Sequence, residues 1–362
     1  MKPSQILGAR SVATRRCTRR FRSLLVCLSS LVLPAFLLAT AYSQDAALSH
    51  FVAFNAPNAG SGASQGTFPA AINKNGWIGG TVVYKTGVSH GFLRQASGAY
   101  IAVNAPTASQ TFVSAINASN EAVGFFNTST LIKAFLRNAA GKYTVLAVAG
   151  ADTTVATGIN ASETIVGYEH DANGFHGFLW TAKAGFTVFD VPGSALGTTF
   201  PLAINNAGTI TGSYTDSNSF GHDFLRNPTG KFTTFEPFAG GTDTQATAIN
   251  TGGQITGWGN DSAGHTDGFL RSATGGITEF FPAGAPGTQP TAINDGGSIV
   301  GYTFTTGCCD SAFERDSSGT NSYITIPFTN SGNRAFGINT SGEVMGSYVD
   351  AAGAFHGWFG TP

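Results

Sequence analysis

The chain has 362 residues, of which 42% are hydrophobic and only 11% are charged, and it contains 48 glycines. So few charges with so much glycine favour short strands and tight turns over helices. Seven of the 19 Lys and Arg residues lie within the first 22 positions, so the chain without residues 1–41 keeps 12 basic against 20 acidic residues, a formal charge of −8. That acidic balance argues against nucleic acid as a partner, because phosphate binding relies on clustered Lys and Arg.

Residues 1–41 have the order of a secretory signal peptide. The basic segment is followed by an apolar stretch from Leu24 to Leu38 and then by Ala39-Thr40-Ala41, a small-residue cleavage pattern. The stretch is too short, and too interrupted at Pro34, for a comfortable membrane span. The sequence predicts a signal peptide at 1–41, a short leader at 42–49, and a mature protein that is secreted (extracellular or periplasmic) and has no membrane span. An uncleaved N-terminal anchor is the alternative.

From residue 50 onward the dipeptide Ile-Asn recurs at intervals of 43 to 45 residues. The seven asparagines are Asn73, Asn117, Asn160, Asn205, Asn250, Asn294 and Asn339. A period in this range is typical of repeat folds whose units bury their apolar faces against one another. Because no linker interrupts the repeat, we expect residues 50–362 to form one domain and the protein to be a monomer.

One unit, read in full, predicts four short strands. They cover residues 199–205, 209–214, 222–226 and 231–237, and turn residues separate them. We name the strands of each unit a, b, c and d in chain order. Four antiparallel strands in about 44 residues are typical of a propeller blade, so the sequence predicts an all-β, seven-bladed β-propeller.

The ends of the chain predict how the ring closes. The last unit lacks strand d, whereas a strand of the d type, residues 50–57, precedes the first unit. This N-terminal strand can complete the last blade and so close the ring.

Within each unit, a glycine lies seven places after the asparagine, which indicates a close backbone approach, expected to the neighbouring blade. Strand c carries a large aromatic residue that is expected in the core between blades. These aromatics are Phe92, Phe135, Phe178, Phe224, Phe269, Phe313 and Trp358.

The unit pattern Ile-Asn-x-x-Gly-x-Ile-x-Gly, followed by His-Gly-Phe-Leu-Arg, resembles the HAF-type extracellular repeat of bacterial secreted proteins. The resemblance covers residues 50–360 and is strongest at His90-Gly91-Phe92 and His176-Gly177-Phe178, whereas Lys133-Ala134-Phe135 and Ser311-Ala312-Phe313 depart from the histidine. It implies an exported, propeller-like protein and brings no assigned activity or catalytic residues.

Candidate ligand-facing residues lie in the b–c loops. Three loops pair an acid with a histidine, and Trp258 with Asp261 and His265 departs most from the repeat; the candidates are Asp171, His176, Asp216, His222, Trp258, Asp350 and His356. One interpretation is a repeated cation or sugar site. The other is a turn in which Asp caps backbone N–H groups and His fixes the start of strand c.

The sequence predicts no catalytic residues, metal ligands or cofactor. Asp216-Ser217-Asn218 begins like a calcium loop, but Phe220 takes a ligand place, so calcium is weakly indicated. No nucleophile elbow or phosphate loop is present. The neighbours Cys308 and Cys309 would form a strained disulfide, and their expected role is inert.

The b–c and d–a loops share one predicted face, which gathers most of the acids; we call it the b–c/d–a face. The opposite face is expected to be basic, with nine Lys and Arg residues against five acids. These basic residues are Lys74, Arg94, Arg137, Lys142, Lys183, Arg226, Lys231, Arg271 and Arg315. Three functional classes follow: a binding module for a glycan, protein or cell surface; an extracellular carbohydrate-active enzyme, a glycosidase or lyase, that uses carboxylates on the b–c/d–a face; and a structural component of an envelope or matrix.

Overall fold

The computed structural model describes residues 45–305, 308–327 and 332–361. The predicted signal peptide at 1–41 lies outside them. Within these ranges the chain forms 29 β-strands and no helix, as the composition predicts. The described residues accordingly include no helix of the length and apolarity that a membrane crossing requires.

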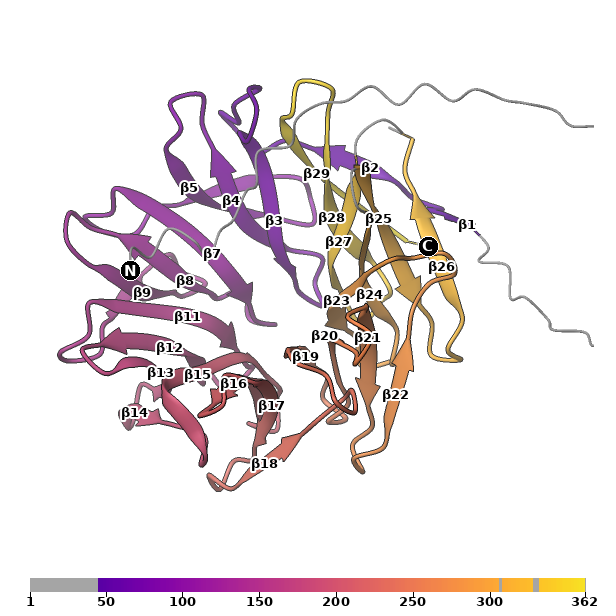
Figure 1. Cartoon of the computed structure of the whole chain (residues 1–362). Helices are drawn as coiled ribbons and strands as arrows, with labels where there is room; N and C mark the ends of the chain where they lie inside the picture. The colour runs from indigo at the N-terminus through magenta and orange to yellow at the C-terminus, as the bar shows by residue number, and fades with distance from the viewer. Residues whose placement is uncertain (1–44, 306–307, 328–331, 362) are drawn as a thin grey trace, which may run out of the picture. The chain divides into compact units, whose positions relative to one another are not determined.

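The strands repeat in groups of four, and Figure 1 shows these groups following one another around a centre within the compact unit Ser43–Pro362. Two short strands, β1 and β2, precede the first group; their bounds are Asp45–Ala47 and Val52–Phe54. The first two groups are β3 (Gly66–Ile72), β4 (Ile78–Val83), β5 (Ser89–Arg94) and β6 (Tyr100–Val103), then β7 (Gln110–Ile116), β8 (Ala122–Asn127), β9 (Ile132–Arg137) and β10 (Tyr143–Leu146). The next two are β11 (Thr153–Ile159), β12 (Ile165–Asp171), β13 (Gly174–Thr181) and β14 (Gly185–Phe189), then β15 (Ser194–Ile204), β16 (Ile210–Asp216), β17 (Gly221–Arg226) and β18 (Phe232–Phe235). The last are β19 (Thr244–Ile249), β20 (Ile255–Asn260), β21 (Thr266–Arg271) and β22 (Ile277–Phe280), then β23 (Thr288–Ile293), β24 (Ile299–Thr305), β25 (Cys308–Arg315) and β26 (Asn321–Thr325), and finally β27 (Asn333–Ile338), β28 (Val344–Val349) and β29 (Phe355–Gly360).

Each group is an antiparallel meander in which consecutive strands pair, so its strands correspond to the predicted a, b, c and d. Single parallel residue pairs join some neighbouring groups, for example Thr153 with Ile132 and Phe175 with Thr198. The last group has only three consecutive strands, and β2 pairs with its outer strand β29 through Val52↔Phe359 and Phe54↔Gly357. The N-terminal strand therefore takes the place of strand d in the last group, as the sequence predicts.

Part of the expected leader is ordered as well. Residues 45–47 form β1, which pairs in parallel with β26 of the preceding group. The N-terminal segment thus binds the outer edges of two adjacent groups, an arrangement that the sequence does not predict.

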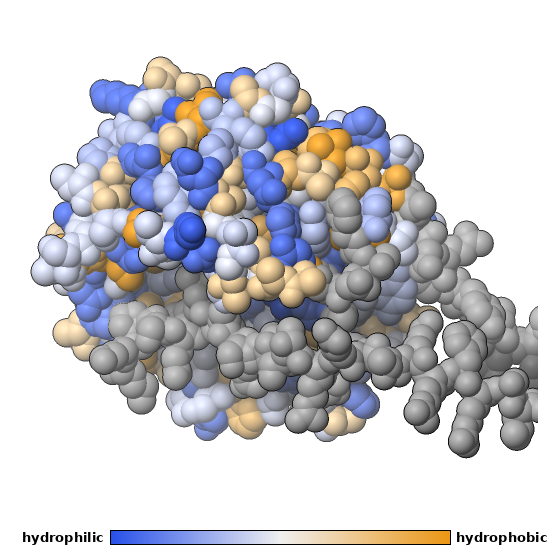
Figure 2. All heavy atoms as spheres, turned by 90° about the horizontal axis from the view of Figure 1, so that it is seen from above, coloured by the Kyte–Doolittle hydropathy of each residue, from blue (hydrophilic) through white to orange (hydrophobic). Residues whose placement is uncertain are grey.

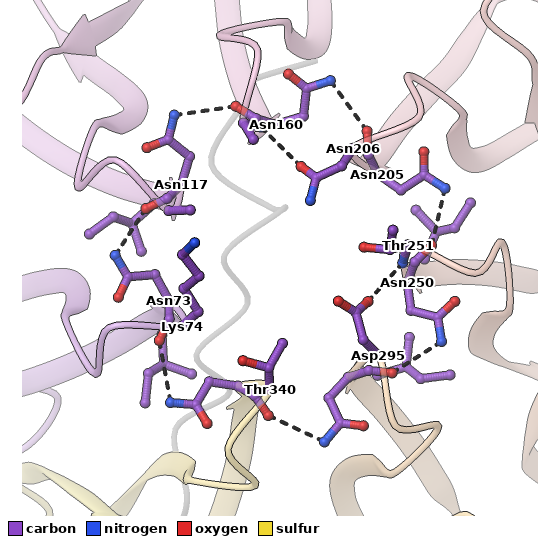
Figure 3. Close-up of a pocket in the computed structure, with 18 of the residues that line it drawn as sticks. Asn73, Lys74, Asn117, Asn160, Asn205, Asn206, Asn250, Thr251, Asp295 and Thr340 are labelled. Carbon is purple, nitrogen blue, oxygen red and sulfur yellow. Dashed lines mark hydrogen bonds between the residues drawn. The ribbon is translucent and has the colours of Figure 1, made fainter.

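The recurring asparagines, which we call the ring asparagines, form a closed circle of hydrogen bonds (Figure 3). The side-chain amide of each donates to the backbone carbonyl of the next one, over 2.9 to 3.3 Å, and Asn339 donates to Asn73 across 266 positions of sequence. The Oδ1 atom of each accepts a backbone N–H of its own a–b turn, such as that of Trp77 at Asn73. Asparagine supplies both the donor and the acceptor from one short side chain, which explains why it recurs at this position.

The strand c aromatics lie in the core and are all at most 2% exposed, as the sequence predicts. The recurring glycines also mark a close approach, but the partner differs from the expected neighbouring blade. A Cβ on Gly212 would lie 2.1 Å from the carbonyl oxygen of Phe200, in strand a of its own group, next to a break in the β15–β16 register. The glycine therefore makes room for a bulge in strand a.

The third residue after each ring asparagine has a positive φ angle, as the turn predicts. This residue is glycine in five groups, and Asn120 and Glu163 have φ angles of 64° and 57° in the other two. Glu163, the exception by residue type, thus follows the rule in its backbone conformation, at a steric cost that glycine avoids.

Asp223 is a carboxylic acid buried inside the fold. It is 0% exposed, its Oδ1 accepts the N–H of Ala246 at 2.7 Å, and its Oδ2 has no partner among the described residues. Burial raises the pKa of Asp223 well above its usual value, because the charged form loses its hydration.

This pKa makes a testable prediction about stability and pH. Burial raises the folded-state pKa of Asp223, so the protonated carboxyl is the form that the fold favours. The contribution of Asp223 to the free energy of unfolding is therefore fully present below the unfolded-state pKa near 4, and it is lost as the pH rises through the folded-state pKa. We expect Asp223→Asn to stabilise the protein relative to wild type by a margin that grows with pH, up to about 1.4 kcal/mol per pH unit. Urea unfolding from pH 4 to pH 8 measures this margin. Glu279→Gln, at an exposed carboxylate of β22, is the control; an equal pH trend in both variants would contradict the assignment.

Candidate functional site

The predicted acid and histidine pairs lie at the b–c turns of three different groups, so they do not form one site. The Nε2 atom of each histidine faces the turn aspartate, at 3.5 Å for His176 and Asp171, 3.4 Å for His222 and Asp216, and 3.1 Å for His356 and Asp350. The Nδ1 atoms are also engaged, by Asp190, Glu236 and Asn55 respectively. Each histidine thus links a b–c turn to a strand d or its end.

The turn aspartates cap backbone N–H groups. Asp216 accepts those of Asn218 and Phe220 at 2.8 and 2.9 Å, and Asp350 accepts those of Ala352 and Ala354 at the same two distances. These bonds, led by the one from Phe220, lower the pKa of Asp216. The geometry supports the turn interpretation of these pairs, since both ring nitrogens of each histidine already have partners.

Glu169 is a buried carboxyl that breaks the repeat beside His176. It is 3% exposed and stands opposite His176 in the β12–β13 register, where the corresponding residues of other groups include Tyr214 and Tyr348. Burial, followed by the charge of Asp171, raises the pKa of Glu169. Burial alone would lower the pKa of His176, but Asp190 and the other carboxylates outweigh it and raise that pKa.

The three arginines Arg94, Arg226 and Arg271 of the expected basic face pack on aromatic rings, whereas lysines of that face such as Lys142 are exposed. Arg94 and Arg271 are 8% and 9% exposed, and their guanidinium groups lie over the rings of Phe359 and Phe235, at 4.6 and 4.9 Å. Arg226 lies over Phe189 in the same way. These arginines cover aromatic core residues, so their charges are less open to solvent than the sequence suggests.

A pocket of about 320 Å³ opens between the fourth and fifth groups, at the b–c/d–a face, and Trp258 lines it. We call it the Trp258 pocket. Phe200 and Tyr214 supply its other aromatic walls, and its polar lining includes Ser213, Asp243, Gln245 and Asn260. Of the predicted candidates only Trp258 lines the pocket, while His222 lies beside it, stacked on Tyr214 with 5.1 Å between ring centroids.

A small side chain at one repeat position contributes to the open space of the pocket. The position after the recurring glycine holds an aromatic in several groups, and Phe125 there stacks on Phe112 of strand a at 4.7 Å. In the fourth group this position is Ser213, opposite Phe200. The serine leaves the space above Phe200 open, and Trp258 of the next group stands at the equivalent position.

Several groups in the pocket have no partner. In the part of the chain that the structure describes, neither the Trp258 indole nor the side chains of Asp243 and Gln245 have a hydrogen bond, and Trp258 has no stacked ring. The equivalent pair in the sixth group differs, since Tyr302 donates a hydrogen bond to Gln289 and its ring packs against Phe336. The Trp258 pocket thus offers an aromatic face and free polar groups to a ligand.

The structure shows no metal site in the described ranges: no group of three or more His, Cys, Asp or Glu side chains there is arranged to hold an ion. Cys308 and Cys309 begin β25, and their side chains lie outside the described part of the structure.

No protein-family model matches the chain, and no curated protein matches it either. Solved structures share its architecture. Virginiamycin B lyase from Staphylococcus aureus superposes with a TM-score of 0.57, at 15% sequence identity, over 86% of this chain and 100% of that one. The BP39L lectin from Burkholderia pseudomallei superposes with a TM-score of 0.51, at 12% sequence identity, over 89% of this chain and 99% of that one.

A prolyl endopeptidase structure gives a TM-score of 0.54, at 12% identity, over 81% of this chain and 49% of that one. At these identities the likeness concerns the fold alone. The described part of the chain therefore has an all-β fold of the propeller type, which unrelated functions share.

Proposed function

We propose that the chain is an exported, monomeric, seven-bladed β-propeller of the HAF-repeat type that binds a glycan in the Trp258 pocket. The predicted signal peptide supports export. The circle of ring asparagines, together with the pairing of β2 with β29, supports seven blades in a closed ring.

The residues that line the Trp258 pocket are the main support for a glycan as the ligand. Sugars present apolar C–H faces between hydroxyl groups, so they pack on aromatic rings and form hydrogen bonds with amide and carboxylate side chains. Trp258 and Tyr214 offer the rings, and Asp243 and Gln245 offer the unpartnered polar groups. A volume of about 320 Å³ is at the small end of ligand sites, which favours one or two sugar residues over a long chain.

A glycan array with the protein lacking residues 1–41, read with and without calcium, tests this proposal. We expect selected neutral or basic glycans to bind, and Trp258→Ala to weaken that binding at least tenfold, because the aromatic face is lost. Gln245→Ala should weaken it as well. The matched control is Gln289→Ala, at the equivalent position of the sixth group, which should leave binding unchanged. Equal effects of both glutamine substitutions, or full binding by Trp258→Ala, would contradict the proposal.

One observation favours a carbohydrate-active enzyme as the second candidate. Glu169 has a raised pKa and nearby Asp171 has a lowered one, caused first by the N–H of Asn173, and such a pair divides acid and base roles. Release of reducing sugar from an array ligand, lost in Glu169→Gln but retained in Trp258→Ala, would support the enzyme over the binding module.

A further inference from the structure

A second pocket, of about 300 Å³, opens at the centre of the opposite face, where the a–b turns meet. Its lining repeats around the circle: each ring asparagine, the isoleucine before it and the residue after it (Figure 3). We call it the axial pocket. The asparagines and isoleucines keep the repeat, so only the residue after each asparagine can give this pocket a particular chemistry.

Backbone N–H groups form the first element of that chemistry. The N–H of Ala161 donates to Oδ1 of Asn206 in the next group at 3.0 Å, and the N–H of Thr251 donates to Oδ1 of Asp295 at 2.9 Å. Both donors are the residue after a ring asparagine, and both acceptors are the same residue of the following group. In these two contacts the N–H at this position donates to an oxygen that comes from the direction of the next group.

The other five N–H groups at this position, those of Lys74, Ala118, Asn206, Asp295 and Thr340, have no acceptor among the described residues. Two of them, at Lys74 and Ala118, lie on adjacent turns. The residues that follow them around the circle are Ala118 and Ala161, whose side chains carry no oxygen. By analogy with the contacts of Ala161 and Thr251, a ligand oxygen bound here would take the place of the missing side-chain acceptor. Two such donors on adjacent turns suit a carboxylate.

Opposite charges form the second element. Of the described residues that line the axial pocket, Lys74 and Asp295 are the charged ones, and they reach into it from opposite sides (Figure 3). Lys74 has no ion pair in the described part of the chain. Asp295 uses Oδ1 for the N–H of Thr251 and keeps Oδ2 for another donor. The pocket is therefore neutral in sum but polarised across its width.

We propose that the axial pocket binds a free α-amino acid as a zwitterion. Its carboxylate lies at the Lys74 ammonium and the N–H groups of Lys74 and Ala118, and its ammonium group donates to Asp295. A simple dianion fits less well, because the Asp295 carboxylate repels it. A simple cation also fits less well, because the Lys74 ammonium repels it. This site is separate from the Trp258 pocket and does not depend on glycan binding.

Isothermal titration calorimetry with L-alanine tests the site, with propionate and ethylammonium as probes that each lack one charge. We expect L-alanine to bind and each single-charge probe to bind at least tenfold more weakly. Lys74→Gln and Asp295→Asn should each weaken L-alanine binding at least tenfold; the asparagine keeps an oxygen for the N–H of Thr251. Lys142→Gln, at an exposed lysine in the β9–β10 turn of the same face, is the control and should bind as wild type does.

A second variant tests the donor geometry directly. Ala118→Asp places a carboxylate where Asp295 stands relative to Thr251, next to the Lys74 ammonium and its N–H. We expect this variant to fold, to melt at a higher temperature than wild type, and to lose L-alanine binding. Equal affinity for propionate and L-alanine, no binding of L-alanine at all, or retained binding by a folded Ala118→Asp protein would each overturn the proposal.

Discussion

Gly212→Val should destabilise the protein by about 3 kcal/mol or more, the largest effect we expect from one substitution in a strand. The new Cβ would meet the carbonyl oxygen of Phe200 at 2.1 Å and the Cα of Pro201 at 2.8 Å, both backbone atoms that cannot rotate away. Only a shift of strand a could relieve the contact, and β15 packs there against the neighbouring groups.

Chemical denaturation of the two proteins measures this loss. Ser217→Val introduces the same side chain in the exposed turn between β16 and β17, where it meets no such contact. This variant should change the free energy of unfolding by less than about 0.5 kcal/mol. Similar unfolding midpoints for Gly212→Val and Ser217→Val would show that the recurring glycines are not required by the bulge.

Deleting residues 42–57 from the protein that lacks the signal peptide should cost about 4 kcal/mol or more and cause aggregation. The deletion removes β2, exposes the edge of β29 and uncovers Trp358, which is 0% exposed and stacks with Phe51 at 6.4 Å between ring centroids. It also removes Phe54, which is 8% exposed.

Deleting only residues 42–49 is the matched control, because it removes β1 and leaves β2 in place. We expect this shorter form to stay monomeric in size-exclusion chromatography and to lose less stability. If the longer deletion were also monomeric, with an unchanged melting temperature, the N-terminal strand would not close the ring.

Most of the fold could be predicted from the sequence repeat. The spacing of Ile-Asn predicted the meanders, the strand c aromatics predicted the core, and the missing last strand d predicted the pairing of β2 with β29. Each of these features depends on a local pattern or on the chain ends. The circle of ring asparagines was not predicted. Its donors and acceptors are 43 to 45 residues apart, or 266 at Asn339, and only the packed arrangement brings them together.

The site was predicted less well. The sequence singled out Trp258 and the b–c/d–a face, but the pocket depends on Ser213 being small and on Asp243 and Gln245 lacking partners, which are properties of packing. Likewise, Arg94 and Arg226 count as charges in a sequence, whereas in the structure they lie over Phe359 and Phe189. Arginine side chains can bury their aliphatic part and stack their guanidinium group on an aromatic ring. A pattern of residue types does not reveal which arginines pack in this way.

The most direct test of the glycan site is the ¹⁵N–¹H spectrum of the tryptophan indoles. The chain has four tryptophans, at positions 77, 180, 258 and 358, and Trp258 alone lines the pocket on the b–c/d–a face. With the indole signal assigned by Trp258→Phe, we predict that a glycan selected on the array shifts the Trp258 signal as it saturates and leaves those of Trp77 and Trp180 in place. Saturable shifts at Trp77 or Trp180 with an unmoved Trp258 signal would contradict the account and place glycan binding elsewhere on the propeller.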